Sequence, residues 1–288
     1  MPVSAAIINI IKQKLNVDIK AASPVSGGDI NEVYRLQSTG GDYIIKINNR
    51  YKFPEMFKRE AEGLAAIKAT KAIGVPDIIF DEEVGDESFL LMEWIDAGQS
   101  TAYASQALGQ QLAQMHRTAT PRFGFATDNY MGSLHQSNKQ HDSWANFFIA
   151  ERLLPMVKMA VDNHELSQTD MRRFEDLYNK LPDLFIEEAP SLIHGDLWGG
   201  NYLISSDGKP YLIDPAVSYS NREFDIAMTT LFGGFDNAFY EAYNAEFPLQ
   251  PGWQKRLKLW NLYPLLVHVN LFGGSYAQQV RQNLAAFV

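Results

Sequence analysis

The segment 194–201 has the sequence His-Gly-Asp-Leu-Trp-Gly-Gly-Asn, and a further carboxylate, Asp214, follows thirteen residues after Asn201. The Asp196 carboxylate could accept the proton of an attacking hydroxyl group. Asn201 and Asp214 offer the oxygen ligands that Mg²⁺ prefers when it is bound to nucleotide phosphates. These residue types predict a phosphoryl-transfer site, with Asp196 as the base and Asn201 and Asp214 as the metal ligands.

The spacing H-x-D-x-x-x-x-N is that of a kinase catalytic loop. By itself the pattern also fits an ordinary surface loop that contains His, Asp and Asn. Its surroundings favour the catalytic interpretation, because the apolar pair Leu192-Ile193 precedes it and an apolar run, 211–213, ends at Asp214. The runs 202–204 and 211–213 flank the turn Ser206-Asp207-Gly208 and predict a β-hairpin.

Lys46 is the single charge inside the apolar run 43–47. A buried ammonium group needs an anionic partner. Glu60, fourteen residues further on in a predicted helix, is the natural candidate, and Glu62 is a rival. Each of these residues could instead lie on a solvated face. As a pair, Lys46 and Glu60 would position the α- and β-phosphates of ATP.

Two further segments could contact a nucleotide. Gly27 and Gly28 lack a Cβ, so the backbone amides around them could approach phosphates closely. A plain hairpin turn is the alternative for this segment. The run 89–95 is expected to join two lobes, with the main chain of Glu93 and Ile95 forming hydrogen bonds with adenine.

The apolar periodicity changes near residue 98. Before it, turn residues and alternation predict strands over 25–36, 43–47, 78–84 and 88–94, with helices over 7–15 and 54–69. After it, helical patterns dominate over 104–118, 141–161, 167–180, 221–247 and 253–286. We therefore expect an α+β protein of two lobes: a β-rich nucleotide-binding lobe, 1–95, and a mainly helical catalytic and substrate lobe, 96–288, with the ligand between them.

Several other polar and aromatic residues are expected to be structural. We expect Asp225 to support the catalytic loop, although it could also begin a helix. His116 and His268 are interpreted as packing residues. The aromatic residues Phe232, Phe235, Phe239, Tyr240 and Tyr243 are expected to form the core face of a helix.

Composition narrows the class of protein. The 288 residues are 46% hydrophobic and 20% charged, which is typical of a globular protein and excludes wholesale disorder. There is no cysteine, so disulfides, thiolate metal sites and a cysteine nucleophile are excluded. The 25 basic and 34 acidic residues give a net charge of −9 without a basic face, which argues against a nucleic-acid partner. The apolar stretch 262–272 is too short to span a membrane. We expect a cytoplasmic protein, monomeric or weakly dimeric.

The chain resembles the fructosamine kinases, the family of fructosamine-3-kinase and ketosamine-3-kinase. These belong to the kinase-like group that includes aminoglycoside phosphotransferases and choline kinases. The resemblance covers nearly the whole length, at GGDINEVYRL (27–36), FKREAEGLAAI (57–67), LLMEWI (90–95), LGQQLAQMHR (108–117), FGFATDNYMG (123–132), HGDLWGGN (194–201), LIDPA (212–216) and REFDIAMTTLFGGF (222–235). The tryptophan of HGDLW and the LFGGF run distinguish this family from the wider group.

The resemblance implies a two-lobed, protein-kinase-like fold. It also implies transfer of the γ-phosphate of ATP, with Mg²⁺, to O3 of the sugar in a ketosamine such as fructose-linked lysine. The 3-phosphate then eliminates and frees the amine, which would be deglycation of an amino acid or a protein. The resemblance makes Gly27-Gly28 a phosphate lid and suggests Asp128, Asn129 and Trp198 as sugar-side residues.

Two alternatives remain open. A kinase of the same fold could act on another acceptor, such as an aminoglycoside or an amino alcohol. A catalytically silent nucleotide-binding protein is the second alternative, and it would be expected to lack at least one of Lys46, Asp196, Asn201 and Asp214. All four residues are present.

Overall fold

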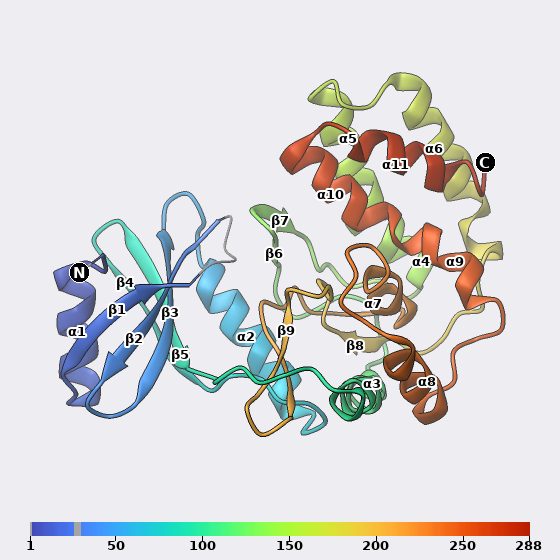
Figure 1. Cartoon of the computed structure of the whole chain (residues 1–288). Helices are drawn as coiled ribbons and strands as arrows, with labels where there is room; N and C mark the ends of the chain where they lie inside the picture. The colour runs from blue at the N-terminus through green and yellow to red at the C-terminus, as the bar shows by residue number, and fades with distance from the viewer. Residues whose placement is uncertain (1, 26–29) are drawn as a thin grey trace.

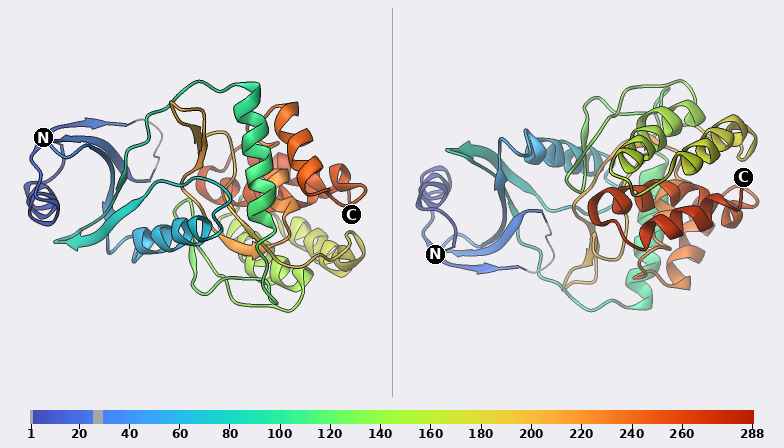
Figure 2. Two further views of the ribbon diagram at one scale, coloured as in Figure 1. Left: turned by 90° about the horizontal axis from the view of Figure 1, so that it is seen from below. Right: turned by 90° about the horizontal axis from the view of Figure 1, so that it is seen from above.

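The structure is a computed structural model that describes residues 2–25 and 30–288. Its amino-terminal part is an antiparallel five-stranded sheet in the order β1-β2-β3-β5-β4 (Figure 1). The strands are β1 (Ile19–Pro24), β2 (Glu32–Ser38), β3 (Asp42–Asn49), β4 (Ile78–Val84) and β5 (Glu87–Glu93). Helix α1 (Ala5–Leu15) lies at the outer end of this lobe, and α2 (Met56–Ala69) lies between the sheet and the rest of the molecule (Figures 1 and 2).

The two faces of the sheet pack against different helices, because successive side chains of a strand point to opposite faces. In β3, Ile45 and Ile47 pack with the buried isoleucines of α1. Ile44 instead packs with the residues of α2, such as Leu64. Lys46 has the same parity as Ile44, so the strand period directs it toward α2 and the cleft rather than toward α1.

The carboxy-terminal part is mainly helical. It contains α3 (Ala102–His116), α4 (Trp144–Phe147), the π-helical turn η1 (Phe148–Leu153), α5 (Leu154–Asp162), α6 (Gln168–Lys180), the 3₁₀ turn η2 (Leu181–Asp183), α7 (Glu223–Met228), α8 (Asn237–Glu246), α9 (Trp253–Trp260), α10 (Leu262–Phe272) and α11 (Tyr276–Leu284). Three short antiparallel two-stranded sheets accompany the helices: β6 (Asn129–Met131) with β7 (Leu134–Gln136), β8 (Ser191–Ile193) with β11 (Ser218–Ser220), and β9 (Tyr202–Ile204) with β10 (Pro210–Leu212).

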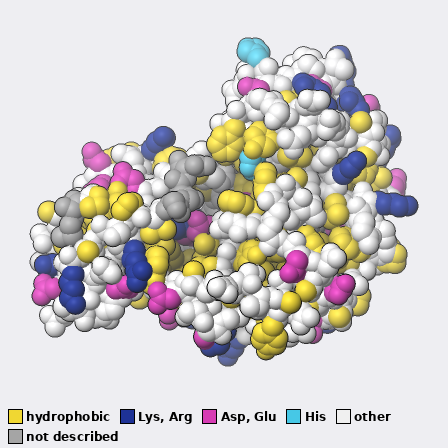
Figure 3. All heavy atoms as spheres, viewed as in Figure 1, with side chains coloured by type: hydrophobic (Ala, Val, Ile, Leu, Met, Phe, Trp, Pro, Cys, Tyr) yellow, Lys and Arg dark blue, Asp and Glu magenta, His cyan; other side chains and the backbone are white. Residues whose placement is uncertain are grey.

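The predicted α+β class and two-lobed organisation are confirmed. Figure 2 shows the sheet and the helical part as two bodies, and Figure 3 shows the surface hollowed between them, with hydrophobic side chains around the hollow. The predicted boundary at residue 95 falls between β5 and α3 and stays a prediction. Among the described residues, no helix is both long and apolar enough to traverse a membrane.

The predicted strand over 25–36 is confirmed only from Glu32 on, as β2. The strands of this region are β1 and β2, on either side of the glycine-containing segment. Strand β1 escaped notice because Ile19 is its only buried residue, so it has no alternating apolar pattern. The three-residue strands β6, β7 and β11 also went unpredicted, because they are too short to show a period.

The predicted long helices are interrupted. The stretch 221–247 divides into α7 and α8 because Gly233 and Gly234 adopt positive φ angles of 75° and 96°, which end regular helix. The stretch 253–286 divides into three helices, with Gly273 and Gly274 at φ angles of 62° and 66° before α11.

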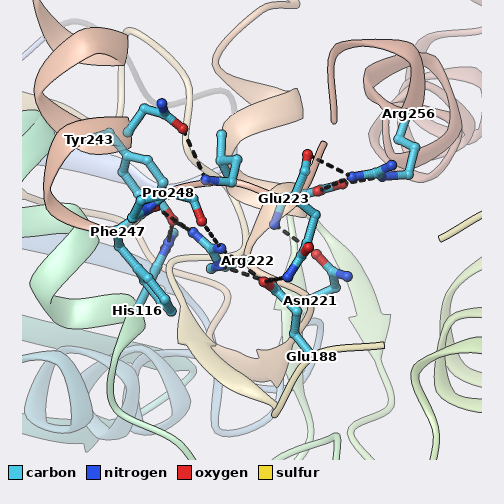
Figure 4. Close-up of polar contacts among 12 residues, drawn as sticks. His116, Glu188, Asn221, Arg222, Glu223, Tyr243, Phe247, Pro248 and Arg256 are labelled. Carbon is cyan, nitrogen blue, oxygen red and sulfur yellow. Dashed lines mark hydrogen bonds and ion pairs between the residues drawn. The ribbon is translucent and has the colours of Figure 1, made fainter. Parts of the chain in front are cut away.

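A buried arginine connects α7 to the rest of the helical lobe. The Arg222 side chain is only 1% exposed and forms a bidentate ion pair with Glu188, with both N–O distances 2.9 Å (Figure 4). It also donates to the carbonyl oxygens of Phe247 and Pro248, at 2.8 and 2.6 Å. The guanidinium therefore joins the segment before β8, the start of α7 and the end of α8.

Replacing Arg222 should destabilise the protein. Arg222→Ala should lower the free energy of unfolding by about 3 kcal/mol, because it leaves the Glu188 carboxylate without its buried partner. Urea denaturation followed by circular dichroism measures this difference. Lys209→Ala is the control: it removes an ion pair to Asp207 in which both side chains are more than half exposed, and should cost less than about 0.5 kcal/mol. Equal losses in the two variants would contradict this role of Arg222.

Candidate active site

The catalytic loop follows β8 and turns sharply at Gly195. This residue has a φ angle of 83°, and a Cβ built on it would lie 2.1 Å from the carbonyl oxygen of Ala216. Ala216 in turn donates its amide to the carbonyl of His194, at 2.9 Å. Glycine is therefore required at position 195 by the close approach of the loop to the segment after Asp214.

A buried carboxylate on α7 forms hydrogen bonds with the backbone of this loop. Asp225 on α7 is fully buried and accepts hydrogen bonds from the backbone amides of His194 and Gly195, at 2.7 and 2.9 Å. The expectation that Asp225 supports the loop is confirmed. Because both amides are fixed by one carboxylate, the backbone orientation at Asp196 is set by the position of α7.

Asp225 is part of a buried polar chain that reaches the Arg222 pair. Its Oδ2 atom lies 3.1 Å from Nε2 of His116, whose Nδ1 lies 2.7 Å from the Tyr243 hydroxyl. Arg222 approaches the same hydroxyl (Figure 4). His116 ends α3 and is buried, as expected. This series of hydrogen-bonded side chains links the catalytic loop to α3 and α8.

Asp196 lies in the loop with its carboxylate close to Asn201. The Asn201 side-chain amide donates to Oδ2 of Asp196 at 2.9 Å and to the Asp196 carbonyl at 2.8 Å. Burial and, to a smaller extent, the nearby charges of Asp214 and Asp225 raise the pKa of Asp196 to about 7, against the opposing effect of the Asn201 hydrogen bond. A carboxyl group that titrates near neutral pH is suited to proton transfer.

His194 is held as a neutral imidazole at the start of the loop. Burial lowers its pKa, although the Asp225 charge acts in the opposite direction. Its Nε2–H donates to the carbonyl of Ile213 at 2.8 Å, and its Nδ1 accepts the amide of Asp196 at 3.2 Å. His194 therefore joins the loop to the strand end that carries Asp214, and it fixes the two acidic residues relative to each other.

The Lys46 ammonium group connects the two lobes. It lies 2.6 Å from Oε1 of Glu60 on α2 and 2.5 Å from Oδ1 of Asp214, which follows β10. The predicted Lys46–Glu60 pair is confirmed. The rival Glu62 instead pairs with Arg59 and accepts a hydrogen bond from Thr127.

These three charges strongly affect one another. Burial alone would lower the pKa of Lys46, but the attraction of Asp214 and Glu60 raises it above its usual value, so the ammonium stays charged. Burial raises the pKa of Glu60, against the attraction of Lys46. Asp214 has a φ angle of 56°, a left-handed conformation that is costly for a residue other than glycine and is often found at functional sites.

The donor set fits a magnesium ion that is bound together with phosphates. Asn201 uses its amide nitrogen toward Asp196, so its oxygen points elsewhere, and Asp214 uses only Oδ1 toward Lys46 among the described residues. A magnesium ion in such sites takes one or two protein oxygens and completes its shell with phosphate and water. Among the described residues there is no cluster of three His, Cys, Asp or Glu side chains that could hold a metal by themselves.

The other predicted nucleotide contacts include two residues where the lobes join, at the end of β5 and between β5 and α3. Glu93 ends β5 with its amide bonded to the carbonyl of Asp77 at 2.8 Å, and Ile95 lies half-buried in the following segment. Gly27 and Gly28 lie outside the described residues.

The three predicted sugar-side residues differ in their surroundings. Asn129 is buried, donates to the Val217 carbonyl and accepts from Gln136, so its amide is used within the protein. Asp128 is about half exposed and accepts from the amide of Asn138. Trp198 is 37% exposed. The structure thus leaves Trp198 and Asp128 available to a ligand and makes Asn129 a structural residue, because it orders the β6–β7 hairpin.

Sequence reasoning missed the contacts by which this hairpin region reaches the sheet lobe. The Thr127 hydroxyl donates to Oε2 of Glu62 at 2.8 Å, and the Tyr130 hydroxyl donates to the carbonyl of Pro54 at 2.9 Å. No local pattern marks either residue, because each contact joins segments more than 60 residues apart. These two hydrogen bonds help to set the spacing between the two lobes.

The fold and this arrangement of Lys46, Asp196, Asn201 and Asp214 define a phosphotransferase of the kinase-like class. The aminoglycoside phosphotransferase APH(4)-Ia, solved as a ternary complex with AMP-PNP and hygromycin B, shares the fold with a TM-score of 0.66 at 12% identity, over 98% of this chain and 99% of that one. A structure from Thermobifida fusca, provisionally assigned as a fructosamine-3-kinase, is more similar, with a TM-score of 0.89 and 31% identity over 99% of both chains.

Sequence comparisons give the particular family. A model of the fructosamine kinase family matches residues 3–288. A probable ketoamine kinase of Enterococcus faecium is 39% identical over 92% of this chain and 94% of its own. The ketosamine-3-kinase of mouse is 32% identical over 93% of this chain and 95% of its own. The chain therefore belongs to the fructosamine kinase family, and membership of a kinase family implies the use of ATP.

The charge of Asp196 should destabilise the protein when metal and nucleotide are absent. Its folded-state pKa of about 7 lies above the value of about 3.9 expected in the unfolded chain. The free energy of unfolding therefore falls as pH rises from about 4 to about 7, because the unfolded chain loses this proton more readily than the folded protein does. Asp196→Asn should therefore raise Tm more at pH 8 than at pH 5. Calorimetry in EDTA measures this, with the exposed Asp162→Asn as control. The same change of Tm at both pH values would contradict the raised pKa.

Proposed function

We propose that this protein transfers the γ-phosphate of ATP to O3 of the sugar in a ketosamine, and that elimination of the 3-phosphate then frees the amine. The observation that carries the proposal is the convergence of Asp196 and Asn201 with the Lys46–Glu60–Asp214 cluster at one cleft. Family membership supports the acceptor class. Fructose- and ribose-derived adducts, on a free amino acid or on a protein, are the candidate acceptors.

Asp196 is proposed as the general base. Its raised pKa lets the carboxylate take the proton of the attacking hydroxyl at neutral pH. The Asn201 amide orients one carboxylate oxygen, while the Asp225 contacts fix the loop backbone. Positioning and electrostatic stabilisation are the main tasks of the protein in such a reaction, because the phosphoryl group itself moves through a loose transition state.

Lys46 is proposed to bind the α- and β-phosphates, with Glu60 holding its side chain in place. In this structure Lys46 also contacts Asp214. Asp214 and Asn201 are proposed as the ligands of Mg²⁺, which would neutralise phosphate charge when it is bound. Gly27 and Gly28 are proposed as the phosphate lid, and the main chain of Glu93 and Ile95 as the adenine contact.

The remaining expectations are part of the same proposal. The division into a nucleotide-binding lobe, 1–95, and a catalytic lobe, 96–288, follows the cleft between the sheet and the helices. A cytoplasmic location and a monomer or weak dimer are proposed as well. Asp128 and Trp198 are the proposed sugar-side contacts, and the hydrogen bonds of Asn129 support its indirect role through the hairpin.

Acceptor-dependent ATP turnover tests the proposed reaction. With Mg²⁺ present, fructosyl-lysine and ribulosyl-lysine should stimulate turnover, whereas kanamycin and choline should not. Asp196→Asn should lower kcat by about 100-fold or more, because the general base is lost, while the Kd of ATP changes little. A fully active Asp196→Asn protein would exclude Asp196 as the base, and turnover with kanamycin or choline alone would replace the proposed acceptor class.

Asp214→Ala should separate the two roles of this carboxylate. Loss of a metal ligand should abolish the gain in ATP affinity that Mg²⁺ gives to the unmodified protein. Release of Lys46 from its ion pair should keep or increase the affinity for ATP in EDTA, since the ammonium then faces only Glu60. Calorimetric titrations with and without Mg²⁺ measure both effects, with Asp162→Ala as control. An unaltered dependence on Mg²⁺ would contradict the metal role.

A further inference from the structure

A continuous row of aromatic rings begins in the catalytic loop, two residues after Asp196. The ring of Trp198 lies 6.1 Å from that of Phe232, between centroids, and Phe232 lies 4.9 Å from His268. His268 lies 5.5 Å from Phe272 and 4.9 Å from Tyr276. We call these five residues the aromatic wall. They come from the catalytic loop, the segment between α7 and α8, α10 and the start of α11.

Three of the five side chains of the wall are exposed to solvent, although large apolar rings that serve only in packing are usually buried. Six large hydrophobic side chains are exposed among the described residues, and three of them, Trp198, Phe232 and Phe272, belong to the wall, at 37, 40 and 57%. The expectation that Phe232 forms part of a helix core is therefore wrong. Phe239 and Tyr243 are buried as expected. Apolar rings gathered at the edge of an active site indicate a binding surface.

Two glycine-containing segments place Phe232 beside Trp198. The backbones of Gly199 and Gly234 touch, since a Cβ on Gly234 would lie 2.6 Å from the Cα of Gly199. The Trp198 ring lies over Gly200, where a Cβ would meet it at 2.3 Å. Both approaches require glycine, so the sequences that follow Trp198 and Phe232 fix the two rings side by side.

His268 gives the wall a hydrogen-bond acceptor. Its Nδ1 lies 2.7 Å from the carbonyl oxygen of Pro264, which can only accept, so Nδ1 carries the proton. Burial lowers the pKa of His268 and favours the neutral ring. Nε2 then offers a lone pair, and it has no hydrogen-bond partner in the described part of the chain. Rings around a neutral acceptor suit a cationic amine with a bound hydrogen.

A carboxylate lies at the outer end of the wall. The Glu165 side chain is next to Gly273, the residue after Phe272, and its Oε1 lies 2.8 Å from the place a Cβ on Gly273 would take. On the other side, Gly132 in the turn of the β6–β7 hairpin lies against Leu271, which a Cβ there would meet at 3.0 Å. The Glu165 carboxylate thus lies beside the segment that joins Phe272 to Tyr276, and the hairpin packs against Leu271, the residue before Phe272.

We propose that the aromatic wall binds the amine side of the ketosamine, that is, the protonated secondary amine and the alkyl chain that carries it. The inference rests on the proposed function, because it needs a ketosamine sugar at Asp196. The amine would lie over the rings near His268, the chain would cross Phe272 and Tyr276, and a terminal cation would approach Glu165. A lysine-type carrier has each of these groups: an amine, a flexible alkyl chain and a terminal α-amino group.

Steady-state kinetics with two acceptors test this inference. Fructosyl-lysine, joined through its ε-amine, contains the carrier, whereas 1-amino-1-deoxyfructose contains the same sugar without it. Phe272→Ala and Tyr276→Ala should each raise the KM for fructosyl-lysine about tenfold, the size expected when an alkyl chain loses its apolar contact with a ring. The KM for 1-amino-1-deoxyfructose should change less than twofold, and kcat and the KM for ATP should not change.

Tyr103→Ala is the matched control, because Tyr103 is an exposed aromatic residue at the start of α3 outside the wall; it should alter neither KM. Glu165→Gln should raise the KM for fructosyl-lysine and not that for its deaminated analogue, which lacks the α-amino group. Wall variants that change both acceptors equally, or neither, would overturn the inference and leave the proposed function intact. Unmodified protein that phosphorylates neither acceptor would instead overturn the proposed function, and the inference with it.

Discussion

The buried Lys46 ammonium group is the constraint on which the cleft depends. A cation at 4% exposure is tolerated only with anionic partners, and here these come from α2 and from the end of β10. The sheet lobe contributes Lys46 and Glu60, while the helical lobe contributes Asp214. The charge of Lys46 therefore has both of its partners only when the two lobes are held together, and Thr127 and Tyr130 add hydrogen bonds between the lobes.

A second buried carboxylate, Asp225, gives the catalytic loop its shape. By accepting both loop amides it fixes the backbone beside Asp196. The half-buried Asp196 carboxylate forms no ion pair among the described residues, and desolvation raises its pKa. The cost of an uncompensated carboxylate is offset by the packing of α3, α7 and α8 around His116 and Tyr243. The reactive group is thus destabilised locally and supported by the core, a common arrangement in active sites.

Much of the site could be predicted because its parts follow local rules. Strand parity directs Lys46 toward α2, and the spacing from Asp196 to Asn201 forms one loop. The features that could not be predicted depend on contacts between residues far apart in the sequence, or on the backbone angles of single residues. The divided helix 221–247 depends on the positive φ of Gly233 and Gly234. The aromatic pattern there predicts a core face, because rings at helical spacing are usually buried. Only the exposed fraction of Phe232 shows otherwise.

The same architecture can serve different acceptors because its two tasks lie on different elements. The side chains proposed to contact phosphate and metal lie on β3, α2, the catalytic loop and the segment after β10. The wall that follows Trp198 is formed largely by the 229–236 segment, α10 and α11. Changes in α10 and α11 therefore need not disturb Asp196 or Lys46. The aminoglycoside phosphotransferase APH(4)-Ia shares this fold at 12% identity, so the fold is kept even where most side chains differ. If the aromatic wall binds the amine as proposed, α10 and the start of α11 are the elements whose side chains select the amine that accompanies the sugar.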